Sequence, residues 1–150
     1  MSEFADLDKV LTDLLTQLSA GQRARAMREV GVALRRSNAE RIAANVSPDG
    51  VAFEPRKKQL KIKGALKRKK TGAMFRKLKL QRYLSSTATP DGAEVSFKGG
   101  AEHIAQVHHY GLVDKVRDGL TVLYPARQLL GINEADRDLV RDILSRHLKL

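Results

Sequence analysis

The sequence has no cysteine and no tryptophan, and it has few prolines and few other aromatic residues. The absence of cysteine excludes a disulfide framework, a thiolate metal site and a cysteine nucleophile. With so few aromatic side chains, recognition of single-stranded nucleic acid by stacking has little to work with. No stretch approaches the roughly 20 apolar residues that span a bilayer, and the acidic N-terminus does not resemble a signal peptide. We therefore expect no association with a membrane.

The sequence also lacks the motifs of common enzymes and metal sites. It contains no phosphate-binding loop, dinucleotide fingerprint or nucleophile elbow. His108 and His109 are adjacent, so on a helix they point about 100° apart, and His103 lies at an unfavourable spacing for a shared metal ion. The acidic residues near the C-terminus fit a helix cap and a solvated face. We therefore expect no catalytic residues, no metal site and no cofactor.

A strong excess of positive charge is concentrated in one segment. The chain carries 28 Lys and Arg against 17 Asp and Glu in 150 residues, a net charge of +11. Thirteen of these basic residues and no acidic residue lie between Pro55 and Pro90. A solvated loop is the ordinary explanation of a charge run, but repulsion between so many like charges favours a nearby anion. The residues predicted to contact DNA phosphates or an acidic partner are Arg56, Lys57, Lys58, Lys61, Lys63, Lys67, Arg68, Lys69, Lys70, Arg76, Lys77, Lys79 and Arg82.

The N-terminal half is expected to form a helical hairpin followed by a basic loop. Apolar residues recur at helical spacing over residues 3–18, and a second, longer helix is predicted over 22–45. The turn "SPDG" ends this helix, because its proline disfavours helical dihedrals in the residue before it. Residues 51–70 show no sustained period and are interpreted as an extended or mobile loop. A short helical stretch is predicted over 72–83.

The C-terminal half is expected to contain a small sheet between two helices. The turn "TPDG" separates "RYLSSTAT" from "AEVSFKG", which predicts a β-hairpin. The stretch "AEHIAQVHHYG" predicts a short helix closed by Gly111 in the left-handed conformation, and a further strand is expected over 120–127, stopped by Pro125. Asn133 and Asp136 have the spacing of a capping box at the start of the last helix. The predicted apolar face of this helix consists of Leu139, Val140, Ile143, Leu144 and Leu148.

These elements predict an α+β fold: an N-terminal helical hairpin, a basic loop, a small antiparallel sheet with a short helix, and a C-terminal amphipathic helix. The length suits one domain. We therefore expect a single domain over residues 1–150, with a flexible basic segment at about 55–82.

Three stretches carry a family resemblance: "RRSNAERIAANVSPDGVAFEPRK" (35–57), "IAQVHHYG" (104–111) and "YPARQLLGINEADRDLVRDIL" (124–144). In this order and spacing they resemble the tail completion, or virion morphogenesis, proteins of contractile-tailed phages of the P2 and Mu type, and most of all the P2 type. The resemblance covers nearly the whole chain. One departure is Phe53, where many relatives carry Trp, and we expect it to affect packing rather than role.

The resemblance implies a structural virion protein that completes the head-proximal end of the tail and enables head–tail joining. It implies other tail and neck proteins as partners and a homo-oligomeric ring, with a hexamer as the working assumption. The protein is expected in the virion tail, after assembly in the host cytoplasm, with its basic segment facing packaged DNA or an acidic ring. The charge alone leaves an alternative open: a small nucleic-acid-binding protein without sequence preference.

The shared motifs are interpreted as structural, since the resemblance carries over no ligand or active-site residue. Phe53 is expected to fill an apolar gap. Arg127 is expected to form a salt bridge, either with the acidic helix of a neighbouring subunit or within its own chain. The residues with an expected structural role are Pro48, Asp49, Gly50, Phe53, Pro55, His108, Gly111, Pro125, Arg127 and Gly131.

Overall fold

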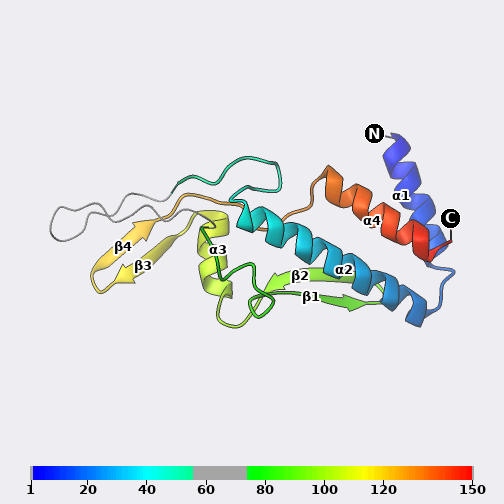
Figure 1. Ribbon diagram of the computed structural model, residues 1–150, viewed down its shortest axis with the longest axis horizontal. Helices are drawn as coiled ribbons and strands as arrows, with labels where there is room; N and C mark the ends of the chain where they lie inside the picture. Colours follow the sequence, from blue (N-terminus) through cyan, green and yellow to red (C-terminus); the bar gives the residue numbers. More distant parts are fainter. Residues whose placement is uncertain (1, 56–73, 150) are drawn as a thin grey trace. The chain divides into compact units, whose positions relative to one another are not determined.

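The protein has the predicted α+β fold in a computed structural model that describes residues 2–55 and 74–149 (Figure 1). The described residues form two compact units. Unit 1 comprises Met1–Ser37, Leu84–Ser96 and Ile132–Leu150, and unit 2 comprises Asn38–Tyr83 and Phe97–Gly131. The elements in chain order are α1 (Ser2–Leu15), α2 (Ala20–Ala43), β1 (Leu84–Thr89), β2 (Gly92–Phe97), α3 (Glu102–Tyr110), β3 (Val113–Arg117), β4 (Leu120–Leu123) and α4 (Glu134–His147).

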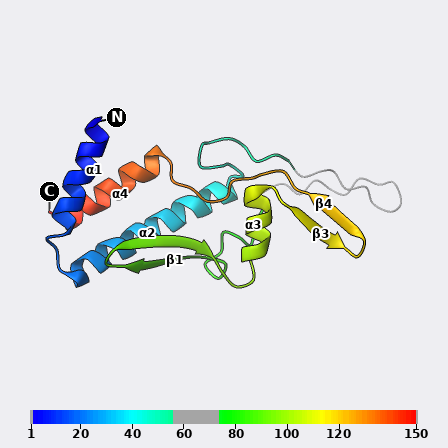
Figure 2. The ribbon, with the colours of Figure 1, turned by 180° about the vertical axis from the view of Figure 1, so that it is seen from behind.

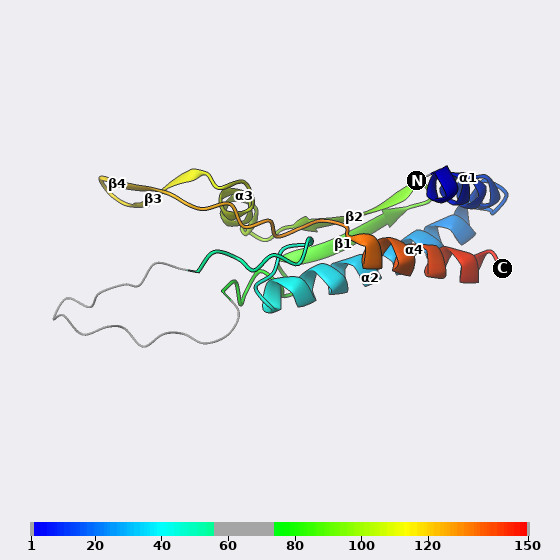
Figure 3. The same ribbon diagram turned by 90° about the horizontal axis from the view of Figure 1, so that it is seen from above.

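The core of unit 1 lies between α2 and α4. Their helical periodicity places Ala26, Val30 and Leu34 on one side of α2, where they pack against Ile143 and Leu144 of α4. Figure 3 shows the two helices side by side along this contact. Burial of these aliphatic side chains is the main interaction that stabilises unit 1. The partly buried residues around this core are Leu15, Met27, Ala33, Ala93, Val95 and Val140.

The β1–β2 hairpin lies along α2 (Figure 2). Gly31 permits this close approach, because a Cβ there would lie 3.2 Å from the Cβ of Ser86 and 3.5 Å from that of Ala93. The Arg35 guanidinium fixes the start of β1 by donating from Nε to the carbonyl oxygen of Leu84 at 2.7 Å. The hairpin predicted around "TPDG" is therefore confirmed, and it sits on the face of α2 that carries a glycine.

The capping box predicted at α4 is also confirmed. The side-chain oxygen of Asn133 accepts from the backbone N–H of Asp136 at 2.8 Å, and the carboxylate of Asp136 accepts from the backbone N–H of Asn133 at 3.1 Å. The Ser37 hydroxyl of α2 donates to the same carboxylate, which is buried. The cap therefore ties the first turn of α4 to α2.

Unit 2 contains α3 and a second hairpin. Helix α3 ends at Gly111 with φ 67° and ψ 57°, which confirms the predicted left-handed cap. Strand β4 ends two residues before Pro125, as expected, but its partner β3 was not predicted. The two strands pair antiparallel, with Val113 opposite Leu123 and an irregularity between Lys115 and Arg117.

Two predictions were wrong. Residues 74–83 form successive turns and no helix; their hydrogen bonds run from Leu78 N to Phe75 O and from Tyr83 N to Leu80 O, over three residues. Bonds over three residues close tight turns, whereas an α-helix needs bonds over four. Leu139 is 38 % exposed, because the face of α4 that packs on α2 centres on Ile143 and Leu144.

The helix ends also differ slightly from the sequence-based bounds. Helix α1 ends at Leu15 rather than 18, and α2 ends at Ala43 rather than 45. The loop predicted over 51–70 falls mostly outside the described residues. Among residues 2–55 and 74–149, no helix combines the length and apolar character needed to cross a membrane.

Candidate functional site

Arg127 brings together residues from all three motif stretches, within unit 2. It is buried, with 5 % of its surface exposed. Its Nε donates to the carbonyl oxygen of Glu54 at 2.8 Å, and its Nη1 lies 3.3 Å from Nδ1 of His108. Its Nη2 reaches the carbonyl oxygen of Pro55 at 3.5 Å. These contacts of Arg127 are to backbone carbonyls and a histidine of its own chain. The salt bridge expected for Arg127 stays a prediction.

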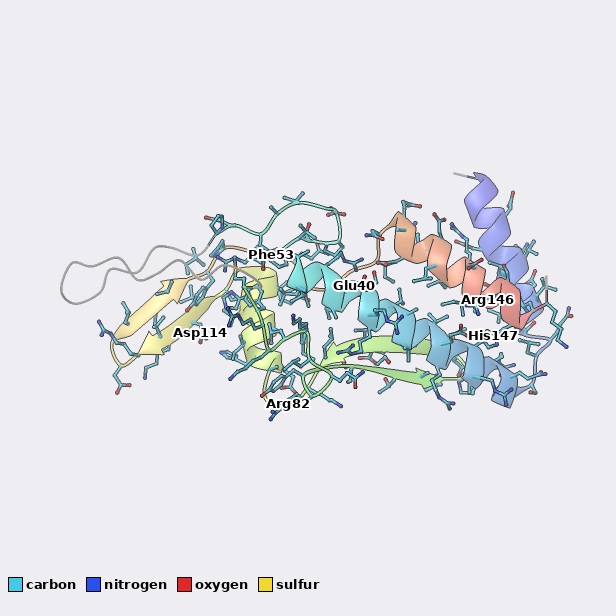
Figure 4. All side chains as sticks on the ribbon, viewed as in Figure 1. Glu40, Phe53, Arg82, Asp114, Arg146 and His147 are labelled. Carbon is cyan, nitrogen blue, oxygen red and sulfur yellow. The ribbon has the colours of Figure 1, made fainter. Side chains whose placement is uncertain are left out.

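A run of aromatic rings lies beside this arginine. Phe53 is buried, as expected, and meets Phe75 edge-on at 5.9 Å between ring centroids. Phe75 meets His108 at 4.9 Å, and His108 meets Tyr124 at 4.7 Å. Edge-to-face pairs at these distances are favourable beyond their buried area. Figure 4 labels Phe53 near α3, the helix that carries His108.

Two glycines of the motifs are required by close backbone approach. A Cβ on Gly111 would lie 2.7 Å from the backbone nitrogen of Ala126, and a Cβ on Gly131 would lie 2.6 Å from Cγ of Pro48. Both backbone polar groups of Gly131 are bonded: its N–H donates to Oδ1 of Asn38 at 3.1 Å, and its carbonyl oxygen accepts from Nη2 of Arg41 at 2.8 Å. Any side chain at either glycine would push apart two segments distant in sequence.

The turn after α2 has the geometry that "SPDG" predicts. Gly50 adopts φ +81°, and its N–H donates to the carbonyl oxygen of Ser47 at 2.9 Å. Pro48 is buried while Asp49 is exposed. Pro55 is exposed and Pro125 is half-buried. We call the ten motif residues together the motif cluster; its named contacts lie within unit 2.

The sequence reasoning missed two residues of this region. Asn45 follows α2 with φ 58°, its carbonyl accepts from the N–H of Phe53 at 2.7 Å, and its Oδ1 accepts from the N–H of Met74 at 2.7 Å. An Asn just after a helix is a known signal for this conformation. Asn38 of α2 is 3 % exposed, and its Oδ1 accepts from the N–H of Gly131.

His109 is held in one tautomer by the backbone. Its Nδ1 accepts from the N–H of Leu129 at 3.1 Å, so its proton must reside on Nε2. Burial lowers the pKa of His109 below its ordinary value of 6.5. At the surface, His103 and Asp114 are paired at 3.1 Å, and the hydrogen bond from His103 lowers the pKa of Asp114.

Of the thirteen residues predicted to contact DNA or an acidic partner, nine lie outside the described residues. These are Arg56, Lys57, Lys58, Lys61, Lys63, Lys67, Arg68, Lys69 and Lys70. Of the other four, Arg76, Lys77 and Arg82 are exposed and Lys79 is partly buried. The Arg82 guanidinium lies 4.9 Å from the ring centroid of Tyr83.

The geometry of the described residues favours a structural role. In the ranges 2–55 and 74–149, no group of three or more His, Cys, Asp or Glu could hold a metal ion. In the motif cluster, the Arg127 side chain donates to the carbonyl oxygens of Glu54 and Pro55, which fixes the position of this loop.

Comparison with known proteins places the chain in a class of virus assembly factors. The profile of the phage virion morphogenesis family matches residues 2–149. Tail completion protein S of Escherichia phage P2 is 39 % identical over 153 residues, covering 99 % of both chains. No solved structure matches significantly. The chain belongs to the phage virion morphogenesis family, and its role is accordingly a structural one in virion assembly.

Proposed function

We propose that this protein completes the head-proximal end of a phage tail and makes it competent to join the head, as a subunit of a homo-oligomeric ring around the DNA channel. The observation that carries the proposal is end-to-end similarity to a protein named for tail completion, at 39 % identity over 99 % of both chains. Because the similarity includes both units, the same overall task is expected of this chain.

The charge distribution supports a place beside a polyanion. Unit 2 has eighteen basic and six acidic residues, whereas unit 1 has ten and eleven. Thirteen of the eighteen lie between Pro55 and Pro90, and the exposed Arg76, Lys77 and Arg82 belong to this set. In the proposed ring, this segment faces the axial channel or an acidic neighbouring ring. Contacts to phosphates alone would let DNA pass without recognition of its sequence.

Neutralising part of the segment tests this role. Changing Lys67, Arg68, Lys69 and Lys70 to glutamine should lower the yield of infectious particles and increase the share of unjoined tails or of heads that have lost DNA. The matched control neutralises four exposed basic residues elsewhere, Lys9, Lys98, Lys115 and Arg117. Equal yields from both variants would contradict the proposed role of the segment.

Nucleic-acid binding without sequence preference is the second candidate, favoured by thirteen basic residues with no acidic residue among them. A DNA-binding titration against salt tests it. Phosphate contacts predict a linear fall of log affinity with log salt, and the quadruple glutamine variant should reduce the slope by about 3–4, since each phosphate contact contributes roughly 0.9. Failure to bind DNA at low salt would instead indicate an acidic protein as the partner of this segment.

A further inference from the structure

Helix α2 carries two kinds of arginine. Arg23 and Arg35 donate to the carbonyl oxygens of Leu18 and Leu84 within unit 1. In contrast, Arg25, Arg28 and Arg36 are exposed, and no acidic side chain of the described residues pairs with them. Three guanidinium groups are thus left on the solvent side of the helix.

These three arginines share one face with an apolar residue. Arg28, Val32 and Arg36 are spaced four residues apart, which keeps them on one side of an α-helix. Val32 is 49 % exposed at the centre of this face. A guanidinium–valine–guanidinium row suits a partner helix that offers two carboxylates and an apolar side chain between them. We call this row the α2 face.

Helix α4 presents the complementary row. Glu134, Asp138 and Asp142 are exposed and also lie four residues apart. Leu139 is 38 % exposed next to them. Asp142 has no basic partner among the described residues. Glu134 pairs with Arg137 at 3.6 Å, and this exposed ion pair contributes little. Asp138 pairs with Arg141, whose side chain is 14 % exposed, at 3.4 Å. We call Glu134, Asp138, Leu139 and Asp142 the α4 face.

The two faces match in length and charge but cannot meet within one chain. Each row covers nine residues, and the eight steps from its first to its last residue span about 12 Å at 1.5 Å per step. The opposite sides of the same helices are already packed against each other through Leu34, Ile143 and Leu144. The α2 and α4 faces therefore point away from this contact in different directions, so a partner must supply the complement.

We propose that the α2 face of one copy of this chain docks on the α4 face of the next. The occupant is a second copy because both complementary rows, with equal spacing and opposite charge, are present on the same unit. Such a contact joins two different patches, so it repeats head to tail and closes into a ring when the rotation permits. This interface rests on the ring in the proposed function and specifies which helices build it.

Charge reversal tests the contact in assembled tails. The variant Arg28→Glu/Arg36→Glu and the variant Glu134→Lys/Asp142→Lys each place like charges across the interface. Supplied to a phage that lacks the wild-type protein, each should enter tails at least about tenfold less than wild type. The chain with all four changes has its charges exchanged and should recover incorporation. The control Lys98→Glu/Arg117→Glu has the same change in net charge as the first variant, at exposed positions of unit 2.

Recovery in the fourfold variant supports the interface even if a single pair of changes weakens folding, because impaired folding would persist when the changes are combined. Loss that is no smaller in the fourfold variant overturns the interface, and so does unchanged incorporation of both reversed variants. If the wild-type chain itself is absent from tails, the proposed function fails, which is a different outcome from an assembled chain with another interface.

Cross-linking provides an independent test, since the chain has no natural cysteine. In particles carrying Val32→Cys and Leu139→Cys in one chain, a short bismaleimide should produce a ladder of linked chains. Either cysteine alone should leave monomers. A dimer from Val32→Cys alone would indicate that two α2 faces meet each other, and particles that contain the double variant but give no ladder would also overturn the proposal.

Discussion

Each of the two units is stabilised internally by its own set of interactions. Unit 1 has nearly balanced charge and an aliphatic core, in which Val30 and Leu34 of α2 meet Ile143 and Leu144 of α4. Its ion pairs join side chain to side chain: Glu29 accepts from Arg146 at 2.8 Å and lies 2.5 Å from His147 (Figure 4).

Unit 2 also buries apolar side chains, among them Ile42 and Leu129, and polar side chains that bond to backbone atoms hold its loops. Arg127, Asn38, Asn45 and His109 each contact a carbonyl or N–H group of a loop. Its hairpin is largely solvated, with Val113 60 % and Leu123 67 % exposed. Apolar burial therefore stabilises both units, and in the unit that carries the cationic segment polar contacts to backbone atoms also organise the loops.

The largest loss of stability is expected from a substitution in the core of unit 1. Ile143→Ala should lower the stability of this unit by roughly 2–5 kcal/mol, because the side chain is 2 % exposed and its removal leaves a cavity. Leu139→Ala, on the exposed side of the same helix, should cost well below 1 kcal/mol. Amide hydrogen exchange in β1 and α4 measures both, and equal losses for the two variants would contradict the assignment of the core.

The corresponding change in unit 2 is Arg127→Met. It leaves the carbonyl oxygens of Glu54 and Pro55 without their donor, at an expected loss of about 2–4 kcal/mol. Exchange protection in α3 and the β3–β4 hairpin should fall, while α4 stays protected. The matched control is Arg117→Met, since Arg117 is exposed. If both Arg127→Met and Ile143→Ala lowered protection throughout the chain to the same extent, the contrast between the units would be lost.

The sequence predicts well those elements whose signals are local. The hairpin turn, the end of α3 at Gly111 and the start of α4 at Asn133 each depend on residues within a few positions of one another. The aliphatic period of α2 and α4 likewise indicates which sides are buried. Because such signals do not depend on distant residues, they predict most elements of unit 1 and the helix α3 of unit 2.

The motif cluster could not be derived in this way. Arg127 meets Glu54 across 73 residues, and Asn38 meets Gly131 across 93. Nothing near an arginine in sequence indicates that its partners are backbone carbonyls of a remote loop. Strand β3, "VDKVR", was missed because its side chains are mostly exposed and show no alternating apolar pattern. The strand forms because its backbone pairs with β4.

A smaller loss of stability is expected from a substitution at the N-cap of α4. Asn133→Ala removes the acceptor for the N–H of Asp136 and should destabilise α4 by about 1 kcal/mol. Asn133→Ser keeps a capping oxygen and should recover most of this loss. Thermal unfolding of both variants checks the prediction. A serine variant no better than the alanine variant would indicate that the cap contributes little to unit 1.

The smallest expected effects are in the pH dependence of stability, which should differ between the two units. In unit 1, hydrogen bonds from His147 and Arg146 lower the pKa of Glu29 below 4.5. A carboxyl with a lowered folded-state pKa stabilises the fold above its ordinary pKa, and the gain is lost as pH falls through the lowered value. In unit 2, burial lowers the pKa of His109 below 6.5, so its contribution begins to fall at a higher pH, near 6.5.

Acidification from pH 7.5 should therefore weaken unit 2 before unit 1. Two variants isolate the groups: His109→Asn keeps an acceptor for the N–H of Leu129 without titrating near neutral pH, and Glu29→Gln removes the carboxylate. The first should flatten the stability of unit 2 as the pH falls from 7 through 6.5, and the second should flatten that of unit 1 only below about 4.5. Urea unfolding with residue-resolved NMR detects each unit separately. A simultaneous acid transition of both units, unchanged by His109→Asn, would show that buried polar contacts do not set the pH response of unit 2.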